Sequence, residues 1–428
     1  MGDQGLTQTV QFSVNELYLL TSKGSFDITM VFEELNIFDN MFTPCMSGNV
    51  MVKDSNNIID NLNIDGGEYI KISIDKGEDN PSYFGFEKMF RIYKISNISN
   101  NNFTTKTFIL HFVSDEYILS EQKKISQSYS GLYSDFVKNI LTKELKISPT
   151  TPKDGKAGIQ SITQSKGIVD IIVPVLTPFD SIEWISKRAV SKTLPDFVFY
   201  ETQFGYSFVS LGSLMSSPAT ADINFNPKSI DNDIMSEMVG ARRFKVISSF
   251  HVADNTTNGV YAGKFSGFDT LTRTNRTTNI DYIDKVFSKM DHPNKNPILP
   301  TTKDSNQYDS RIVVYPYAEP RTTNQYIKGN NTELSSKIDN TQDYIFQRKS
   351  IFYALMQRRI QIVLPGNFYL CTGKIVNILL PNYTSNDGSR EPVDASMSGN
   401  YIILGTRHTV RFDRHETIIE VATDSTNK

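Results

Sequence analysis

Residues 67–74 read GEYIKISI, and this stretch decides the fold that the sequence predicts. Its isoleucines fall on one face of an extended chain and Tyr69 and Lys71 fall on the other, which is the pattern of a half-buried β-strand. Similar strand-like runs surround it at residues 10–14, 26–32, 48–53, 89–98 and 103–113. So many short strands in so short a segment predict an antiparallel β-barrel or sandwich over residues 1–115.

Two connections are expected inside this first unit. Residues 54–57 read DSNN and are expected to form a turn or cap before a short helical turn at residues 58–62, because these side chains can bond to backbone amides. Residues 99–102 read SNNN and are expected to form the polar loop of a hairpin between the two longest strands.

A helical pattern replaces the alternating one after this unit. Apolar residues between Leu132 and Leu145 recur at the spacing of one helix face. A second helix is expected to begin at Thr177, which can cap it, with Pro178 at its first position and Asp180 at its third. A hairpin around the turn sequence TQFG should follow. Together these elements predict a mixed α+β unit at residues 116–225.

Strand-like runs return toward the end of the chain. They predict a second, discontinuous β-barrel formed by residues 226–255 and 360–428. Residues 256–338 are rich in Asn, Thr, Asp, Lys and Pro, and this stretch is too long for a plain loop in a compact domain. We therefore predict an insertion at residues 256–359, with minor structure and one helix near residues 341–359.

The two strand-rich regions resemble each other. In the first region, residues 67–72 precede a loop and the unit ends at residues 109–115. In the second, residues 373–378 precede a loop and the unit ends at residues 418–424, again on an aspartate. This agreement suggests a duplication with two similar β-units in each chain. Three such chains would present six similar units around an axis. Such a ring can join an assembly with three-fold symmetry to one with six-fold symmetry.

The composition argues against several classes of function. A length of 428 residues suggests two to four units. The net charge of −3 lacks the surplus of Lys and Arg that non-specific nucleic-acid binding requires. No run of apolar residues is long enough for a membrane-spanning helix, and we expect no signal peptide. Cys45 and Cys371 are expected to be buried thiols.

Motifs for nucleophilic, phosphate-binding, dinucleotide-binding and metalloprotease chemistry are absent, so we predict no catalytic, cofactor-binding or metal-binding residues. His408 and His415 flank an expected hairpin and could approach each other. A core or surface role is favoured over a metal site, because no cysteine or carboxylate cluster accompanies them. Two carboxylate pairs are expected in solvated turns: Glu33 with Glu34, and Asp231 with Asp233.

Two groups of basic residues are expected on solvated faces, with contact to an acidic neighbouring protein as the alternative. They are the pair Arg242 and Arg243, and the cluster of Arg348, Lys349, Arg358 and Arg359. Trp184, the single tryptophan, is expected to pack in the core on the apolar side of its helix.

Several stretches carry a resemblance to a known family in the same order. They are residues 46–57 leading to GEYIKIS, the Trp184 helix followed by residues 196–199, PGNFYL at 365–370 followed by TGKIV at 372–376, and the closing stretch 401–424. In these stretches the chain resembles the baseplate central hub protein of T-even-type contractile-tailed phages, over nearly its whole length. Residues 256–340 are expanded relative to that family.

The resemblance implies a β-rich α+β protein with two tail-tube-like antiparallel β-barrel units, a mixed α+β unit and an inserted segment. It implies a homotrimer in the baseplate of the virion tail, assembled in the host cytoplasm. The implied partners are the central spike protein, the tail tube protein or tube-initiator ring, and the baseplate wedge proteins. Genomic DNA would pass through the lumen without specific binding. The resemblance implies no catalytic activity and no membrane insertion by this chain.

Two alternatives remain open. One is a hub or tube-initiator protein of another contractile injection system, with the same fold and different partners. The other is a tail-associated cell-wall hydrolase, against which the lack of a recognisable catalytic cluster argues.

Overall fold

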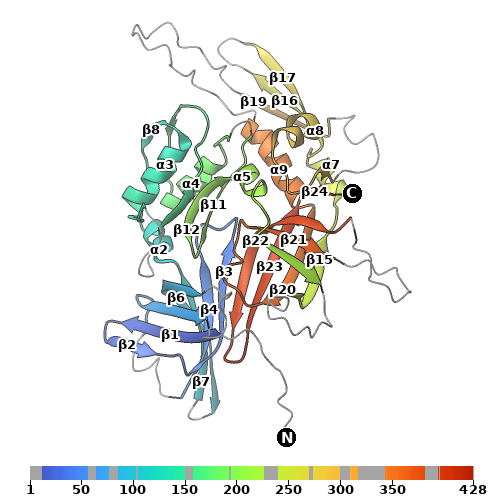
Figure 1. Cartoon of the computed structure of the whole chain (residues 1–428). Coiled ribbons are helices and arrows are strands. Elements are labelled where there is room, and N and C mark those ends of the chain that lie inside the picture. The colour runs from blue at the N-terminus through green and yellow to red at the C-terminus, as the bar shows by residue number, and fades with distance from the viewer. Residues whose placement is uncertain are drawn as a thin grey trace, which may run out of the picture.

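The computed structural model describes residues 12–55, 64–76, 85–102, 105–149, 158–191, 194–225, 240–268, 273–298, 309–316, 343–380, 394 and 396–427. In these residues β-strands predominate and the helices are short, which confirms the predicted β-rich class. Figure 1 shows N-terminal strands at the lower left, C-terminal strands at the lower right, and the helices and small sheets above them. None of the described helices is long and apolar enough to cross a membrane.

The N-terminal strands form one half of the largest sheet. They are β1 (Phe12–Thr21), β2 (Gly24–Asp27), β3 (Phe32–Asn40), β4 (Ser47–Asp54), β5 (Tyr69–Lys76), β6 (Phe86–Asn102) and β7 (Thr105–Val113). Their lateral order is β3-β4-β7-β6-β5-β1-β2, and every neighbouring pair is antiparallel. The alternating sequence that predicted a strand lies in β5, between β1 and β6.

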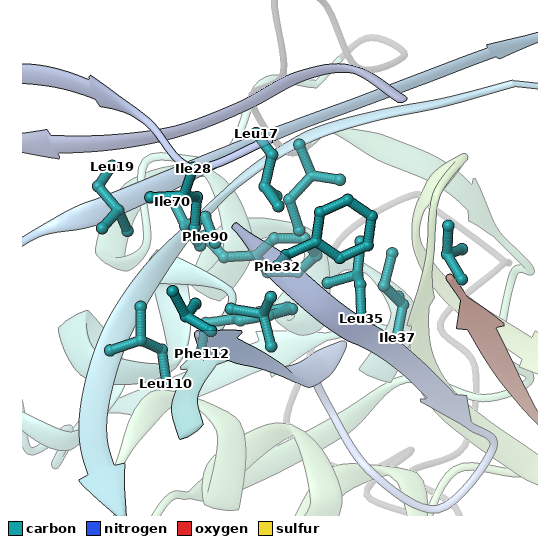
Figure 2. Packing of buried hydrophobic residues seen from close by; sticks show 14 of the residues in the cluster. Leu17, Leu19, Ile28, Phe32, Leu35, Ile37, Ile70, Phe90, Leu110 and Phe112 are labelled. Carbon is teal, nitrogen blue, oxygen red and sulfur yellow. The ribbon is translucent and has the colours of Figure 1, made fainter. Parts of the chain in front are cut away.

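Alternation along these strands directs their apolar side chains into one core. Ile70, Ile72 and Ile74 of β5 are completely buried, as the sequence predicts. Figure 2 shows side chains from neighbouring strands converging on the same cluster. The rings of Phe90 and Phe112 lie 4.9 Å apart there. Burying each such side chain contributes about 1.5–3 kcal/mol, so this core stabilises the first half of the sheet.

The other half of the sheet comes from the C-terminal part of the chain. Its strands are β13 (Ala221–Phe225), β14 (Gly240–Ala241), β15 (Arg243–Ser248), β20 (Arg358–Pro365), β21 (Ile375–Leu379), β22 (Gly399–Val410) and β23 (His415–Thr423). They are paired in the order β15-β20-β23-β22-β21-β13-β14. A separate apolar cluster lies under them.

The two halves follow the same lateral order. The series β3-β4-β7-β6-β5-β1 has its counterpart in β15-β20-β23-β22-β21-β13. The chain passes through the corresponding strands of the two series in the same order. Neighbouring strands are antiparallel in both series except at the last pair, where β21 and β13 are parallel. The expected repeat falls on equivalent strands, because β5, β6 and β7 correspond to β21, β22 and β23.

One strand belongs to both halves. Along one side of β22, residues 399–402 pair with β21, and residues 405–410 pair with β3. The other side of β22 pairs with β23, with a bulge between Ile403 and Gly405. The two halves are therefore joined by backbone hydrogen bonds into one 14-stranded sheet.

The predicted mixed α+β segment packs above the first half. Its elements are α2 (Asp115–Glu121), β8 (Ser128–Gly131), α3 (Tyr133–Asn139), the π-helix η1 (Ile140–Glu144), β9 (Ile159–Ile162), β10 (Val169–Ile172), α4 (Pro178–Ser186), β11 (Phe197–Thr202), β12 (Gly205–Ser210) and α5 (Leu211–Met215). Thr177 Oγ1 accepts a hydrogen bond from the Asp180 amide at 3.2 Å, which confirms the predicted helix start. The hairpin of β11 and β12 is also confirmed. Trp184 packs against the apolar cluster of this segment.

The expected insertion contains more structure than its sequence indicates. Its elements are α7 (Val252–Thr257), β16 (Ala262–Phe268), β17 (Asn275–Asp281), α8 (Tyr282–Lys285), η2 (Phe287–Lys289), β18 (Asn296–Pro297), β19 (Arg311–Pro316), η4 (Asp343–Gln347) and α9 (Arg348–Leu355). The order β17-β16-β19 forms a small sheet, whose core is Phe265, Ile280 and Phe346. Because this sheet buries so few side chains, its strands lack the long apolar runs that mark a strand in sequence. The short β18 pairs with β24 (Ser425–Thr426) near the end of the chain.

Three predicted boundaries are wrong. The run expected as one strand at 26–32 is interrupted at residues 28–31, because the chain turns there between β2 and β3. The residues expected as a loop at 99–102 belong to β6, which continues past a bulge where Asn97 has a φ of 54°. The helix expected at 341–359 ends at Leu355, and Arg358 and Arg359 already pair with β23 as part of β20. The helical turn expected at 58–62 lies outside the described residues.

Candidate functional site

The described part of the chain contains no group of three or more His, Cys, Asp or Glu residues that could hold a metal ion. The carboxylate pairs expected in turns do not form a site there. Glu34 lies in β3 and accepts a hydrogen bond from Arg411 Nε at 3.0 Å, so the expectation of a solvated turn is wrong for this residue. Asp231 and Asp233 lie outside the described residues. Buried charged residues are instead found at three junctions, where the N-terminal strands, the mixed α+β segment, the C-terminal strands and the insertion contact one another.

The two histidines do approach each other, but as core residues. His415 Nε2 lies 3.3 Å from His408 Nδ1, and His408 Nδ1 lies 3.1 Å from the hydroxyl of Thr417. Both imidazole rings pack on Phe368, at centroid distances of 4.4 and 4.5 Å. Burial lowers the pKa of His408 to about 3 and that of His415 well below its usual value. Both rings are therefore neutral, and their position agrees with the expected core role.

The first junction joins the N-terminal strands to the mixed α+β segment through a buried ion pair. Lys88 on β6 contacts Glu201 on β11, and the two residues are only 6% and 1% exposed. Glu201 Oε2 also accepts hydrogen bonds from the Met46 amide at 2.8 Å and from the Ser114 hydroxyl at 2.6 Å. These contacts compensate the glutamate charge in an environment where an unpaired charge would be costly.

A second carboxyl group extends this junction. The Tyr206 hydroxyl donates to Glu116 Oε2 at 3.4 Å and lies 3.4 Å from Cys45 Sγ. Burial, and then the nearby charge of Glu201, raise the pKa of Glu116 to about 7. Cys45 is a buried free thiol, as is Cys371, which confirms both expectations.

The second junction lies where β3 meets β22. Asp39 of β3 is 5% exposed, and its Oδ1 accepts hydrogen bonds from the Thr372 hydroxyl at 2.8 Å, the Thr406 hydroxyl at 2.5 Å and the Thr406 amide at 3.1 Å. Burial raises the pKa of Asp39 to about 6, although these hydrogen bonds act in the opposite direction. One buried carboxyl group thus connects both halves of the large sheet.

The third junction joins the helix of the insertion to the mixed α+β segment. Arg348 Nη1 donates to the carbonyl oxygens of Ser186, Pro195 and Phe197 at 3.0, 3.1 and 2.9 Å. Burial lowers the pKa of Arg348 to about 10. The guanidinium therefore binds backbone oxygens of a neighbouring segment, and the expected solvated face is wrong for this residue.

The other members of that basic cluster are also engaged within the chain. Lys349 Nζ donates to Asn258 Oδ1 at 2.7 Å. Arg358 is buried and donates to the carbonyl oxygen of Ser396. Arg359 pairs with Glu420 at 3.2 Å. The cluster is dispersed because the helix ends before residues 358 and 359.

A groove lies between the first and third junctions, with a volume of about 510 Å³. We call it the acidic groove. Phe179, Val198, Phe199, Phe352 and Met356 supply apolar lining, and Arg348 also borders it. Its other lining residues include Phe42, Tyr117, Glu121, Asp180, Glu183 and Lys187. Lys187 pairs with Glu183 on the exposed surface of α4. The groove thus combines an apolar floor with three acidic side chains.

Sequence reasoning named Arg348 only as part of a basic cluster and did not identify Lys88, Asp39 or Glu201. Asp39 and Glu201 each stand as a single charged residue beside an aromatic neighbour, whereas Lys88 directly follows Glu87. Such isolation was the available signal, because a charge in an otherwise apolar strand needs a partner when it is buried. The identity of that partner depends on contacts between distant segments.

Comparisons with known proteins give a likeness of fold. No protein-family model and no curated protein matches the chain. Its structure is similar to that of a tail protein from Neisseria meningitidis MC58, with a TM-score of 0.52, 11% identity and coverage of 97% of each chain. It is also similar to a 43 kDa tail protein of prophage MuSo2 from Shewanella oneidensis, with a TM-score of 0.52, 9% identity and coverage of 96% of this chain and 98% of that one. The chain therefore shares its fold with tail proteins over nearly its full length.

Proposed function

We propose that this chain is a non-enzymatic structural hub of a phage tail baseplate. Three copies form a ring that adapts a three-fold central spike to a six-fold tail tube and leaves an axial channel for DNA. The fold shared with two tail proteins supports a place in a tail. The nearest alternative keeps the same architecture but assigns the hub to another contractile injection system.

The observation that carries the proposal is the repeated strand order. The series β3-β4-β7-β6-β5-β1 and β15-β20-β23-β22-β21-β13 supply two comparable β-units in one chain. We assign them as the two tail-tube-like units. Residues 1–115 are the first, and residues 226–255 with 360–428, together with the preceding strand β13 at 221–225, are the second. Residues 116–220 form the mixed α+β domain, and residues 256–359 form the insertion.

Symmetry links this duplication to the function. A ring of three chains with two similar units each offers six similar surfaces to a hexameric tube. The same ring retains exact three-fold symmetry for a trimeric spike. We therefore propose the spike, the tube protein or tube-initiator ring and the wedge proteins as partners, with the virion baseplate as the location. DNA would cross the channel without specific binding, in keeping with a net charge of −3.

Electron cryo-microscopy of the purified full chain, together with its mass in solution, tests this proposal. We expect trimers whose averaged images show six similar β-units around a central channel. A chain that remains monomeric at about 50 µM contradicts the ring, since stable homomeric assemblies form well below such concentrations.

An assay on purified peptidoglycan tests the non-enzymatic part of the proposal. We expect no release of soluble fragments by the full chain, with a known lysozyme as the positive control. Cleavage that copurifies with this chain and persists at constant specific activity would favour the cell-wall hydrolase instead.

A further inference from the structure

The pairing of β3 with β22 joins the two β-units of one chain, and we call it the in-chain seam. Residues 35–40 of β3 lie opposite residues 405–410 of β22. The chain therefore already contains the contact by which one unit adds to the next. A ring of similar units repeats one type of contact at every boundary, so the in-chain seam indicates which strands meet at the boundary between copies.

β6 of the first unit is the counterpart of β22, and the two strands correspond closely. The Ile92 amide of β6 donates at 2.9 Å to the carbonyl oxygen of the residue just before β5, and the Ile403 amide of β22 donates at 2.9 Å to that of the residue just before β21. In both strands a bulge against the next strand follows at once. The residues of β6 from Lys94 onward therefore correspond to those of β22 from Gly405 onward.

The side of β6 that corresponds to the in-chain seam has no strand beside it in the described structure. β5 pairs with β6 only as far as Arg91, and no other described strand pairs with that side beyond it. The equivalent part of β22 is covered by β3, and Leu404 there is 3% exposed. Its counterpart Tyr93 is 49% exposed, and Ile98 farther along β6 is 60% exposed. This edge of β6 therefore leaves apolar groups open to water.

β15 is the counterpart of β3, and among the described strands it pairs with β20 alone. Val246 of β15 lies opposite Ile360, which is completely buried, so both side chains point toward the same core. The matching position of β3, found by counting along the paired strands from the two bulges, is Ile37, which is also completely buried. Val246 is 39% exposed. A core-facing valine that remains this exposed at a strand edge indicates that another strand completes the core.

The two edges lie on opposite sides of one chain. The hydrogen-bonded path from β6 to β15 passes through β7, β4, β3, β22, β23 and β20. At about 4.8 Å per strand, the edges are about 34 Å apart along the sheet. Figure 1 shows β6 on the left and β15 on the right. The edges can therefore meet only between copies. Such a contact is head-to-tail, which is the type that closes rings when the rotation between copies permits.

We infer that β15 of one copy adds, antiparallel, to the free edge of β6 of the next copy, and that this strand contact closes the ring. Backbone hydrogen bonds join the two strands, as they join β3 to β22 in the in-chain seam. Val246 then joins the core of its unit, as Ile37 does in the first unit. Arg243 and Lys245 point to the other face of β15, so their charges stay in water. This inference rests on the proposed trimeric ring and identifies the strands that form it.

The in-chain seam also gives the register, which a disulfide can test. Arg407 lies opposite Phe38 there, and the same positions in the seam between copies are Ser96 of β6 and Ile247 of β15. Opposite residues of antiparallel strands have Cα atoms about 4.5–5.5 Å apart, which suits a disulfide. A chain with Ser96→Cys is mixed with a chain with Ile247→Cys under a mild oxidant, and we expect a disulfide-linked dimer that neither chain forms alone. One chain with both substitutions should give a covalent trimer.

Glu87→Cys combined with Ile247→Cys is the matched control. Glu87 is exposed on the same strand as Ser96, but it lies opposite β5 and about 30 Å farther along. This combination should stay uncross-linked, and so should the unchanged chain, whose two cysteines are buried. Equal yields of covalent product from Glu87 and Ser96 would overturn the seam.

A second variant is designed to break the seam and keep the folded chain. Val246→Asp places a carboxylate on the core side of β15, where the seam would enclose it without a partner, and an unpaired buried charge is costly. Val246 is exposed in the single chain, so folding should be retained, which circular dichroism checks. Sedimentation should show monomers at a concentration where the unchanged chain is trimeric. Ile312→Asp, at an exposed apolar position of the edge strand β19, is the matched control and should remain trimeric.

The outcomes separate the seam from the proposed function. If the unchanged chain is trimeric, the absence of the cross-link between Ser96 and Ile247 overturns the seam and leaves the ring intact. Trimers of Val246→Asp that are as stable as those of the unchanged chain have the same meaning. If the unchanged chain is itself monomeric under these conditions, the ring fails and the seam fails with it.

Discussion

Lys88 of β6 and Glu201 of β11 form an ion pair that is almost fully enclosed between the N-terminal strands and the mixed α+β segment. Two further donors, the Met46 amide and the Ser114 hydroxyl, bind the same carboxylate. The pair therefore holds β6 of the N-terminal strands against β11 of the mixed α+β segment. Its value for stability depends on the presence of both partners, because the charge of one is compensated by the other.

We predict that Lys88→Met destabilises the protein by about 3–5 kcal/mol, since it leaves Glu201 buried without its cation. The double variant Lys88→Met with Glu201→Leu should recover part of this loss. Urea unfolding followed by fluorescence measures both changes. Lys71→Met is the control, because Lys71 pairs with Glu16 on the surface, and it should shift the midpoint far less. Equal shifts for Lys88 and Lys71 contradict the role of the buried pair.

Asp39 should make stability fall as the pH rises. Its pKa is raised to about 6 by burial, so between about pH 4 and 6 the folded carboxyl group keeps a proton that the unfolded chain has lost. The folded state is therefore favoured at the lower end of this range, by up to about 3 kcal/mol. Asp39→Asn should remove this dependence, so that its stability relative to the unchanged chain increases from pH 4 to pH 7. If the stabilities of the variant and the unchanged chain vary with pH in the same way, Asp39 does not contribute to this dependence.

The histidine pair should act in the opposite direction. Burial lowers the pKa of His408 to about 3, so the folded ring stays neutral while the unfolded ring gains a proton as the pH falls below about 6.5. Stability contributed by this group is thus present at neutral pH and lost in acid. We expect His408→Asn to lower stability at pH 7.5 and to flatten its decline toward pH 4.5. Thermal unfolding between pH 7.5 and pH 4.5 measures this decline in stability. If the variant declines as steeply as the unchanged chain, His408 is not its cause.

Gly48 should tolerate no larger side chain. An added Cβ would lie 2.4 Å from the Asn36 carbonyl oxygen and 2.4 Å from the Phe112 ring, because β4 lies between β3 and β7 over the first core. We expect Gly48→Ala to destabilise the protein by at least about 1–3 kcal/mol. At Gly67 the nearest atom is 3.9 Å away, so Gly67→Ala is the control and should leave the melting temperature nearly unchanged. Similar melting temperatures for the two variants contradict this packing.

Arg348→Met should loosen the contact between α9 and the mixed α+β segment. It removes the donor to three backbone oxygens, and a hydrogen bond of this kind to a charged group contributes about 1.5–3 kcal/mol. Hydrogen exchange should accelerate in α9 and in β11, while β5 remains unchanged. Lys187→Met, at the exposed C-terminal end of α4, is the control and should accelerate exchange in neither element. Uniform acceleration across the chain would instead indicate global destabilisation.

The sequence predicts this fold best where the structure around a residue is determined by residues close to it in sequence. Alternation identified β5, and the cap at Thr177 identified the start of α4, because both depend on local geometry. The extent of β6 was missed, since the bulge at Asn97 lets a polar run remain paired with β7. The end of α9 was missed because pairing of Arg358 with β23 overrides helix periodicity.

The junctions were not predictable in the same way. Asp39 and Thr406 are separated by most of the chain, and their contact exists because β3 pairs with β22. Arg348 looked like part of a basic helix face, and its partners are backbone oxygens that carry no sequence signal. The approach of His408 and His415 was predictable, because a short hairpin connects them.

The continuous pairing of β22 with β21, β23 and β3 has a mechanical consequence. A flexible linker between two similar units would let each tilt independently under load. Here a tilt would have to break several backbone hydrogen bonds in the same strand at once, in shear rather than one after another. Torque applied to the N-terminal half is therefore transmitted to the C-terminal half with little loss, and the angle between them is set by the geometry of a single strand.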